Sequence, residues 1–224
     1  QAVEEISFQR FKGETLGVVG AAGCGKAPTG RLVLRLLEPT SGTVTFKGQD
    51  MSSLKKKDLR AMRKQMQIIF QDPYASLDPR KTVFQILAEP YQIHHPEMSR
   101  EEIYSQVTRL IDCVGLRPEH IYRYPHEFSG GQRQRVGIAR AIALNPEFVV
   151  CDEPVSALDV SIQAQVINLM QDIKKEFNLT YMFISHDLRI IKHFCDRVMV
   201  MYLGNIVELG TREGIYEKRR HPYT

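Results

Sequence analysis

The sequence has little that is typical of a secreted, metal-binding or membrane-spanning protein. Its four cysteines are scattered and form no CxxC pair, so the sequence indicates neither a zinc site nor a disulfide framework. No uninterrupted apolar run approaches the ~20 residues that a helix needs to cross a bilayer. No signal peptide is recognisable. A reducing, cytosolic compartment fits these features best.

The sequence also has no large excess of positive or negative residues. The formal net charge is +4, which is too small to indicate nucleic-acid binding by itself. The short basic runs at 55–57 and 218–220 are interpreted first as solvated faces, and only second as a membrane or partner patch. His94 and His95 lack a neighbouring cysteine or acid cluster, so we do not interpret them as a metal pair.

The length and the residue pattern predict one α/β domain with a helical insert. The 224 residues suffice for a substantial domain, and a start at Gln1 instead of Met indicates a fragment of a longer protein. Short apolar runs alternate with helical patterns, which predicts a mostly parallel sheet. From Asp72 to about Ile142, helical segments separated by Pro- and Gly-containing turns indicate the insert. Strands are expected at 15–19, 43–46, 67–70, 148–151 and 180–184, helices at 31–37, 100–114 and 161–177, and a hairpin at 198–208.

A glycine-rich segment follows the first expected strand. Residues 20–26 read GAAGCGK and match most of the phosphate-binding pattern GxxxxGK[ST]. Glycines let backbone N–H groups turn toward phosphate oxygens, while the next helix N-terminus and a lysine add positive charge. A glycine-rich turn near a lysine can also be only a turn. The expected ATP-binding residues are Gly20, Gly23, Cys24, Gly25, Lys26, Ala27 and Pro28.

The end of this segment departs from the pattern. Ala27 stands where the pattern needs a Ser or Thr hydroxyl that ligates Mg²⁺. Pro28 follows, and proline has no backbone N–H to offer to a phosphate. Each hydrogen bond to a charged group is worth about 1.5–3 kcal/mol. We therefore expect weakened binding of Mg-nucleotide.

Residues 148–153, FVVCDE, form an apolar run that ends in two acids. Asp152 is the expected Mg²⁺ ligand, directly or through water. Glu153 is the expected base, because a carboxylate at a strand end can orient and deprotonate a water that attacks a γ-phosphate. Taken alone, the run also fits a buried strand that ends in solvated acids.

Residues 127–132, EFSGGQ, place a serine and two glycines at the start of an expected helix, which is a second anion-binding nest. Here the sequence resembles the ATP-binding cassette (ABC) family, whose signature motif reads LSGGQ. The resemblance implies that two cassettes pair head to tail, with ATP held between the P-loop of one and the signature of the other. The signature residues acting on the partner's nucleotide would be Ser129, Gly130, Gly131 and Gln132.

Three further residues follow in the order that the family has them. Gln71 resembles the Q-loop glutamine, which contacts Mg²⁺ or water and links the subdomains. Asp159, in SALD, resembles the D-loop aspartate at the dimer interface. His186 resembles the switch histidine beside the γ-phosphate. The resemblance implies a P-loop NTPase (RecA-like) core with an antiparallel β portion, formed by 1–72 and 143–224, and a helical subdomain at 73–142.

Four longer stretches narrow the resemblance to the dipeptide and oligopeptide importer branch, which nickel and glutathione importers share. They are IFQDPYASLDPR (69–80), EFSGGQRQR (127–135), EPVSALDVS (153–161) and HPYT (221–224). The family also has an aromatic residue before the P-loop that stacks on adenine, and a segment after HPYT. Neither lies within these residues.

The resemblance implies an ATP hydrolase that uses ATP and Mg²⁺ and energises a membrane importer. Its expected partners are a second cassette, identical or different, transmembrane permease subunits and, indirectly, an extracytoplasmic substrate-binding protein, with no nucleic acid. It would lie at the cytoplasmic face of the membrane. Two alternatives remain: a regulatory cassette impaired by Ala27 and Pro28, and a non-transport ABC ATPase acting on DNA or ribosomes. The second usually carries a coiled coil or two cassettes, which are not seen here.

Overall fold

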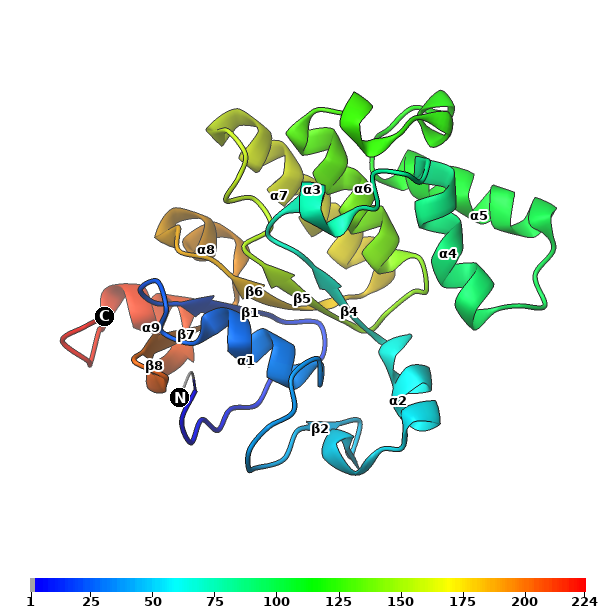
Figure 1. Ribbon diagram of the computed structural model, residues 1–224. Helices are drawn as coiled ribbons and strands as arrows, with labels where there is room; N and C mark the ends of the chain where they lie inside the picture. Colours follow the sequence, from blue (N-terminus) through cyan, green and yellow to red (C-terminus); the bar gives the residue numbers. More distant parts are fainter. Residues whose placement is uncertain (1–2) are drawn as a thin grey trace.

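The computed structural model describes residues 3–224 and is built around one sheet with the strand order β4-β5-β6-β1-β7-β8 (Figure 1). Strands β4 to β7 of this order pair in parallel, and β8 pairs with β7 in antiparallel fashion. The mostly parallel sheet and the hairpin around Gly204 are thereby confirmed. The strands are β1 (Thr15–Val19), β4 (Met66–Ile69), β5 (Phe148–Asp152), β6 (Thr180–Ile184), β7 (Arg197–Tyr202) and β8 (Asn205–Thr211).

The central strands are buried on both faces because helices cover both sides of the sheet. Along β5, Phe148 and Val150 belong to one hydrophobic cluster, while Val149 and Cys151 belong to the other. This alternation explains why the strand reads as a continuous apolar run. All five residues of β1, β5 and β6 are buried.

Helix α1 (Lys26–Val33) covers the first face, together with α2 (Lys56–Arg63) and the ribbon of β2 (Thr45–Phe46) and β3 (Gln49–Asp50). Gly30 lets α1 approach the sheet closely, because a Cβ there would lie 2.8 Å from Cγ1 of Val150. The strand expected at 43–46 is only two residues long in the structure, at Thr45–Phe46. A 3₁₀ turn, η1 (Met51–Ser53), follows the ribbon.

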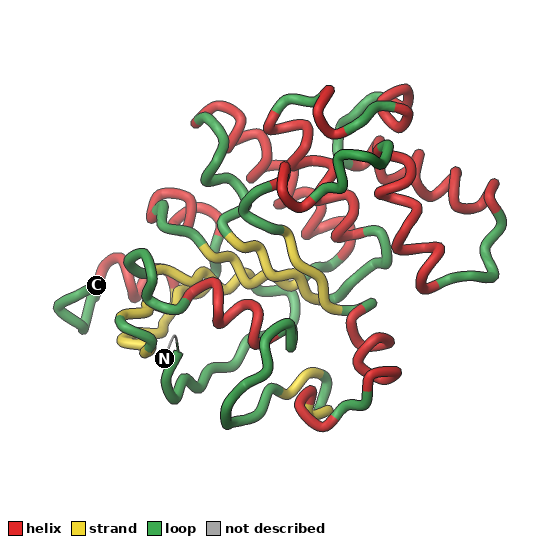
Figure 2. Tube along the Cα trace, in the orientation of Figure 1, coloured by secondary structure: helices red, strands yellow, loops and turns green. Residues whose placement is uncertain are grey.

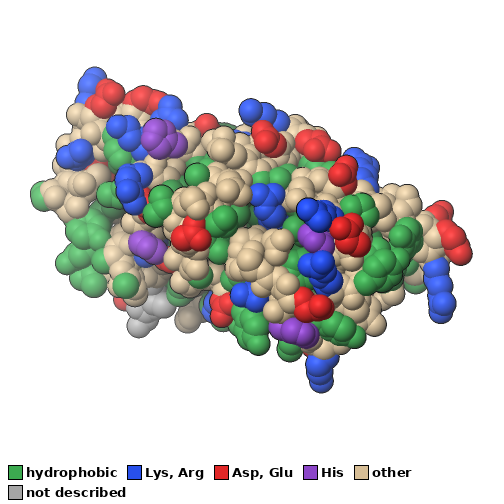
Figure 3. Space-filling view, turned by 90° about the horizontal axis from the view of Figure 1, so that it is seen from above, with side chains coloured by type: hydrophobic (Ala, Val, Ile, Leu, Met, Phe, Trp, Pro, Cys, Tyr) green, Lys and Arg blue, Asp and Glu red, His purple; other side chains and the backbone are tan. Residues whose placement is uncertain are grey.

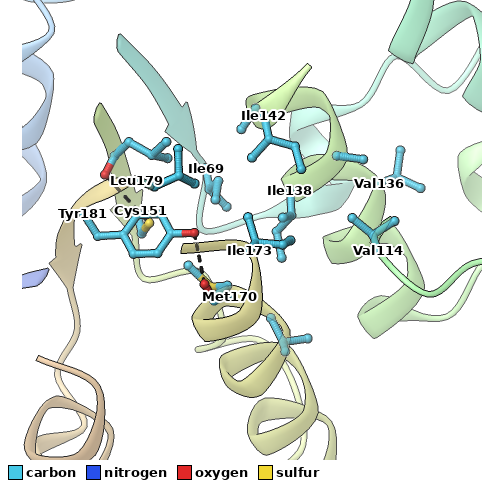
Figure 4. Packing of buried hydrophobic residues seen from close by; sticks show 14 of the residues in the cluster. Ile69, Val114, Val136, Ile138, Ile142, Cys151, Met170, Ile173, Leu179 and Tyr181 are labelled. Atoms are coloured by element: carbon cyan, nitrogen blue, oxygen red, sulfur yellow. Dashed lines mark hydrogen bonds between the residues drawn. The ribbon is translucent and has the colours of Figure 1, made fainter. Parts of the chain in front are cut away.

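The second face carries α6 (Gly130–Ile142), α7 (Val160–Phe177) and α8 (Leu188–Phe194), while α9 (Arg212–Glu217) packs on β7 and β8. Ile138 and Ile142 of α6 lie near Ile173 of α7 and Tyr181 of β6 (Figure 4). The buried Tyr181 hydroxyl donates a hydrogen bond to the Met170 carbonyl, with an O···O distance of 3.2 Å.

The stretch between β4 and α6 is helical, as expected, and lies beside the sheet (Figure 2). Thr82, Ser99 and Ser129 begin their helices with reciprocal side-chain caps, which satisfy amides that would otherwise lack partners. The elements of this stretch are α3 (Pro73–Ser76), α4 (Val83–His94), α5 (Arg100–Cys113), η2 (Pro118–Tyr122) and η3 (Pro125–Glu127).

One predicted helix is wrong in its bounds. Apolar spacing suggested a helix over 31–37, but α1 begins at Lys26 and ends at Val33. Arg35 adopts a left-handed backbone with φ of 50°, and the Leu36 amide donates back to the Arg31 carbonyl at 2.8 Å. This is the hydrogen-bond pattern of a helix C-terminus. The Arg35 guanidinium donates to the carbonyls of Met51 and Leu54, which fixes the turn.

Candidate functional site

The glycine-rich segment forms the turn between β1 and α1, in the expected strand–turn–helix context. Gly20 has φ of 155°, and a Cβ there would lie 2.2 Å from the Met201 carbonyl oxygen, so only glycine fits. Gly25, with φ of 100°, precedes α1 as its N-cap. The amides of the first turn of α1 lack intrahelical partners and are available to an anion.

Lys26 is folded back onto the turn that precedes it. Its side chain is buried, and Nζ donates to the carbonyls of Gly20 and Ala21 at 2.8 and 2.9 Å. Nζ also lies 3.9 Å from Sγ of the buried Cys24. The positive charge therefore sits inside the loop at the start of α1, where a phosphate would be received.

The two unusual residues occupy the second and third positions of α1. Pro28 fits there because the first helical turn does not use its amide. The next hydroxyl, Thr29, does not replace the missing one. It is buried and donates to the Gly25 carbonyl at 2.8 Å.

Asp152 ends β5 with its carboxylate almost wholly buried. Its nearest cation is Arg31 of α1, with Nη2 4.0 Å from Oδ2. Burial raises the pKa of the Asp152 carboxyl above its ordinary value, and the Arg31 charge acts in the opposite direction.

The residues at this edge of the sheet fit a magnesium ion with one protein ligand fewer than the pattern requires. Mg²⁺ prefers oxygen ligands and retains several waters beside one or two carboxylates and substrate phosphates. The Asp152 carboxylate would supply one such ligand. The Gln71 amide oxygen would supply a second, because the bond to Glu153 uses Nε2 instead. Ala27 offers a methyl group where the third would be.

Gln71, Glu153 and His186 meet on one carboxylate oxygen. Oε2 of Glu153 lies 3.3 Å from Gln71 Nε2 and 3.0 Å from His186 Nδ1. The backbone of Glu153 has φ of 45°, and its amide donates to the Ile184 carbonyl at 3.1 Å. Such backbone strain in a non-glycine residue is found at functional sites more than elsewhere. Among residues 3–224, no hydrogen bond engages Oε1, which is free to accept one from water.

The signature residues form the start of α6. Ser129 is its N-cap: Gln132 N–H donates to Oγ at 3.3 Å, and Ser129 N–H donates to Gln132 Oε1 at 3.0 Å. Gly131 is buried, and a Cβ there would lie 2.4 Å from Cγ2 of Ile162. Gly130 packs near Leu158. Within the part of the chain that the structure describes, no hydrogen bond joins these residues to the glycine-rich turn.

Asp159 caps α7, whose first residue is Val160. Its Oδ1 accepts from the Ile162 amide at 3.0 Å and from the Ser161 hydroxyl at 2.8 Å. These bonds, the Ile162 amide foremost, lower the pKa of Asp159. The residue thus has a local structural role in addition to the interface role that the family resemblance implies.

Sequence reasoning missed two residues at the site. Arg31 follows Ala27 by four positions, so helical spacing alone could have placed it on the same face. Tyr223 accepts a hydrogen bond from the Ala21 amide at 2.8 Å, across a sequence separation of 202 residues. No local pattern could have indicated that contact.

Comparison with known proteins identifies the family. The family model described as "ABC transporter" matches residues 3–156. The chain is 56% identical over its whole length to the oligopeptide transport ATP-binding protein AppF of Bacillus subtilis, of which it covers 68%. It is 54% identical to the glutathione import ATP-binding protein GsiA of Pectobacterium atrosepticum, of which it covers 36%.

Among solved structures, a dimeric ATP-binding cassette, MJ0796 bound to ADP and Pi, superposes with a TM-score of 0.85 at 25% identity. The alignment covers 94% of this chain and 90% of that one. The P-loop NTPase fold with its helical insert is thereby confirmed. The strand-end site and these similarities agree, and the chain belongs to the ABC transporter family as an ATPase.

Proposed function

We propose that this chain is the ATP-hydrolysing subunit of a membrane importer for oligopeptides. The single observation that carries the proposal is the meeting of Gln71, Glu153 and His186 beside a P-loop. The 56% identity to AppF over the whole chain supports oligopeptides as cargo. Glutathione is the second candidate, supported by 54% identity to GsiA.

In this proposal the P-loop binds the phosphates of ATP. The free amides of α1 and the Lys26 ammonium face the phosphates, and Lys26 has three N–H donors, of which the carbonyls of Gly20 and Ala21 use two. Magnesium, held by Asp152 and Gln71, would neutralise phosphate charge. Glu153 accepts a proton from the attacking water on Oε1, while His186 and Gln71 hold Oε2 in place.

The same proposal requires a second cassette. Ser129, Gly130 and Gly131 stand at a helix N-terminus without a bond to their own P-loop, so they would meet nucleotide on a partner, identical or different. Closure of the pair would move the helical subdomain, residues 73–142, against the core of 1–72 and 143–224. The segment after Gln71 would pass this movement to a permease.

Membrane association would be peripheral, at the cytoplasmic face and through the permease, with an extracytoplasmic binding protein delivering cargo. Within residues 3–224, no helix is long and apolar enough to cross a bilayer. Basic and acidic side chains are mixed over the face seen from above (Figure 3), which gives no support to a nucleic-acid partner.

An impaired, regulatory cassette is the alternative that a specific observation favours. Ala27 and Pro28 remove a metal ligand and an amide from the P-loop, and Thr29 does not compensate. Such a chain would pair with an active cassette and contribute its signature residues to the partner's nucleotide.

The experiment replaces Glu153 with Gln in the complete transporter and measures ATP turnover and nucleotide retention. General base catalysis contributes about 10²–10⁴-fold, so we expect a turnover loss of that order with ATP still bound. Glu217→Gln, at an exposed helix end, is the matched control. Parental turnover in Glu153→Gln would remove Glu153 as the base. In proteoliposomes, uptake of oligopeptides in preference to glutathione would decide the cargo.

A further inference from the structure

The first turn of the P-loop is held from two sides by segments distant in sequence. The Ala21 amide donates to the Tyr223 hydroxyl at 2.8 Å. At the other end of the turn, the Gly204 amide donates to the Cys24 carbonyl at 3.1 Å. The turn itself is closed by a bond from the Cys24 amide to the Ala21 carbonyl at 3.3 Å. The β7–β8 turn and the C-terminal segment therefore brace the loop together.

Tyr223 is held in position by its own surroundings. Its ring centroid lies 4.5 Å from that of Tyr202, the last residue of β7. The Glu208 carboxylate on β8 accepts from the amides of Arg220 and His221 at 3.0 and 3.3 Å. The ring contact with Tyr202 and the bonds to the Glu208 carboxylate thus hold the segment 220–224 in place. They position the Tyr223 hydroxyl next to the Ala21 amide.

A single peptide group connects the hydrogen bond of Tyr223 to that of Lys26. The peptide that links Gly20 and Ala21 accepts from Lys26 Nζ on its carbonyl, at 2.8 Å, and donates its N–H to Tyr223. Hydrogen bonds in series through one peptide group polarise and strengthen each other. The hydroxyl of Tyr223 and the ammonium of Lys26 are therefore coupled, although they do not touch.

We propose that Tyr223 is a positioning residue for the P-loop. Its hydroxyl fixes the orientation of the Gly20–Ala21 peptide and, through it, the placement of Lys26, so that nucleotide affinity depends on the segment 220–224. The role rests on the proposed nucleotide binding by the P-loop. It adds a function for the HPYT segment, which lies outside the nucleotide-binding motifs.

The first test needs no nucleotide. Tyr223→Phe keeps the ring beside Tyr202 and removes only the acceptor for the Ala21 amide. Tyr202→Phe is the matched control, because no hydrogen bond within the described chain uses that hydroxyl. A single neutral hydrogen bond corresponds to about a 2- to 12-fold effect. We expect hydrogen exchange of the Ala21 amide, followed by NMR, to accelerate by that factor in Tyr223→Phe only. Equal exchange in parent and variant overturns the role.

The second test measures affinity in a background with Ala27→Ser and Pro28→Thr. Tyr223→Phe should weaken Mg-ATP binding and raise KM by about 2- to 12-fold. We expect kcat at saturating ATP and the thermal unfolding midpoint to stay unchanged, which separates positioning from a general loss of structure. An unchanged Kd overturns the role even if exchange is faster. If the background without Tyr223→Phe binds no nucleotide, the proposed function fails, and the exchange result still decides on Tyr223.

Discussion

Restoring the two missing groups of the P-loop should restore tight binding of Mg-ATP. The variants are Ala27→Ser, which adds a hydroxyl, and Pro28→Thr, which adds an amide N–H. Both residues lie in the first turn of α1, where an amide has no intrahelical partner and stays available to a ligand. The side chains at positions 27 and 28 are both half-buried, so neither change has to be fitted into a fully buried site.

The magnitude follows from the two bonds. The hydrogen bond from the added amide to a charged phosphate is worth about 1.5–3 kcal/mol, and we take about the same value for coordination of the metal by the added hydroxyl. Both together amount to about 3–6 kcal/mol, which at ~1.4 kcal/mol per decade is a 10²- to 10⁴-fold lower Kd. The hydroxyl acts through the metal and the amide acts directly on phosphate. The gain from Ala27→Ser should therefore vanish with EDTA, while the gain from Pro28→Thr should persist.

The assay is calorimetric titration of each single variant and the double variant with ATP, with and without Mg²⁺, followed by ATP turnover. Ala22→Ser is the matched control, because it adds a hydroxyl to an exposed position of the same loop. We expect its Kd to stay within about twofold of the parent, an effect well below one hydrogen bond to a charged group.

Two results would refute the reasoning. If the parent already binds Mg-ATP as tightly as the double variant, the remaining amides, Lys26 and Asp152 suffice without the hydroxyl. If Ala27→Ser improves binding equally with and without Mg²⁺, the added hydroxyl does not act as a metal ligand.

Two further predictions concern residues that pack around the site. Gly131→Ala places a Cβ 2.4 Å from Ile162, and overpacking of about 1–3 kcal/mol should lower the thermal midpoint by about 2–12 °C. Gly137→Ala, in the same helix with no atom within 4 Å, should not lower it, and equal midpoints would contradict the clash. Burial raises the folded-state pKa of Asp152 above the unfolded value. The contribution of this carboxyl to the free energy of unfolding is therefore fully present at low pH, and it is lost as pH rises through the folded-state pKa. Asp152→Asn should therefore raise the midpoint at pH 7, and thermal melts should show the difference fading below the ordinary pKa of about 3.9. An equal gain at all pH values would contradict this cause.

The parts of the site that sequence reasoning could locate are those whose chemistry sits at strand ends. A short apolar run followed by Gln71, Glu153 or His186 is visible in the sequence, because buried parallel strands are uniformly apolar. The turn at Gly204 was visible for a similar reason, since a glycine between two apolar runs predicts a hairpin.

The parts that escaped prediction depend on contacts between distant segments. The end of α1 is set by Arg35, whose guanidinium bonds to Met51 and Leu54, and helical periodicity carries no information about those carbonyls. The contact of Tyr223 with Ala21 depends on the β7–β8 hairpin bringing the C-terminal segment back to the P-loop. Helix propensity and apolar spacing are local properties of the sequence, so they predict neither the end of α1 nor the contact of Tyr223 with Ala21.

The order of the strands explains why the catalytic candidates meet whatever residues stand at positions 27 and 28. Strands β4, β5 and β6 are neighbours, and Gln71, Glu153 and His186 follow their carboxyl ends. Residues separated by 82 and 33 positions in sequence thus share one carboxylate oxygen. Ala27 takes no part in the side-chain bonds of this cluster, and neither does Pro28. The frame of the site is therefore independent of the side chains at positions 27 and 28, which in the proposed function would face the ligand. This independence is the physical reason to expect that restoring those two side chains restores binding without repacking the domain.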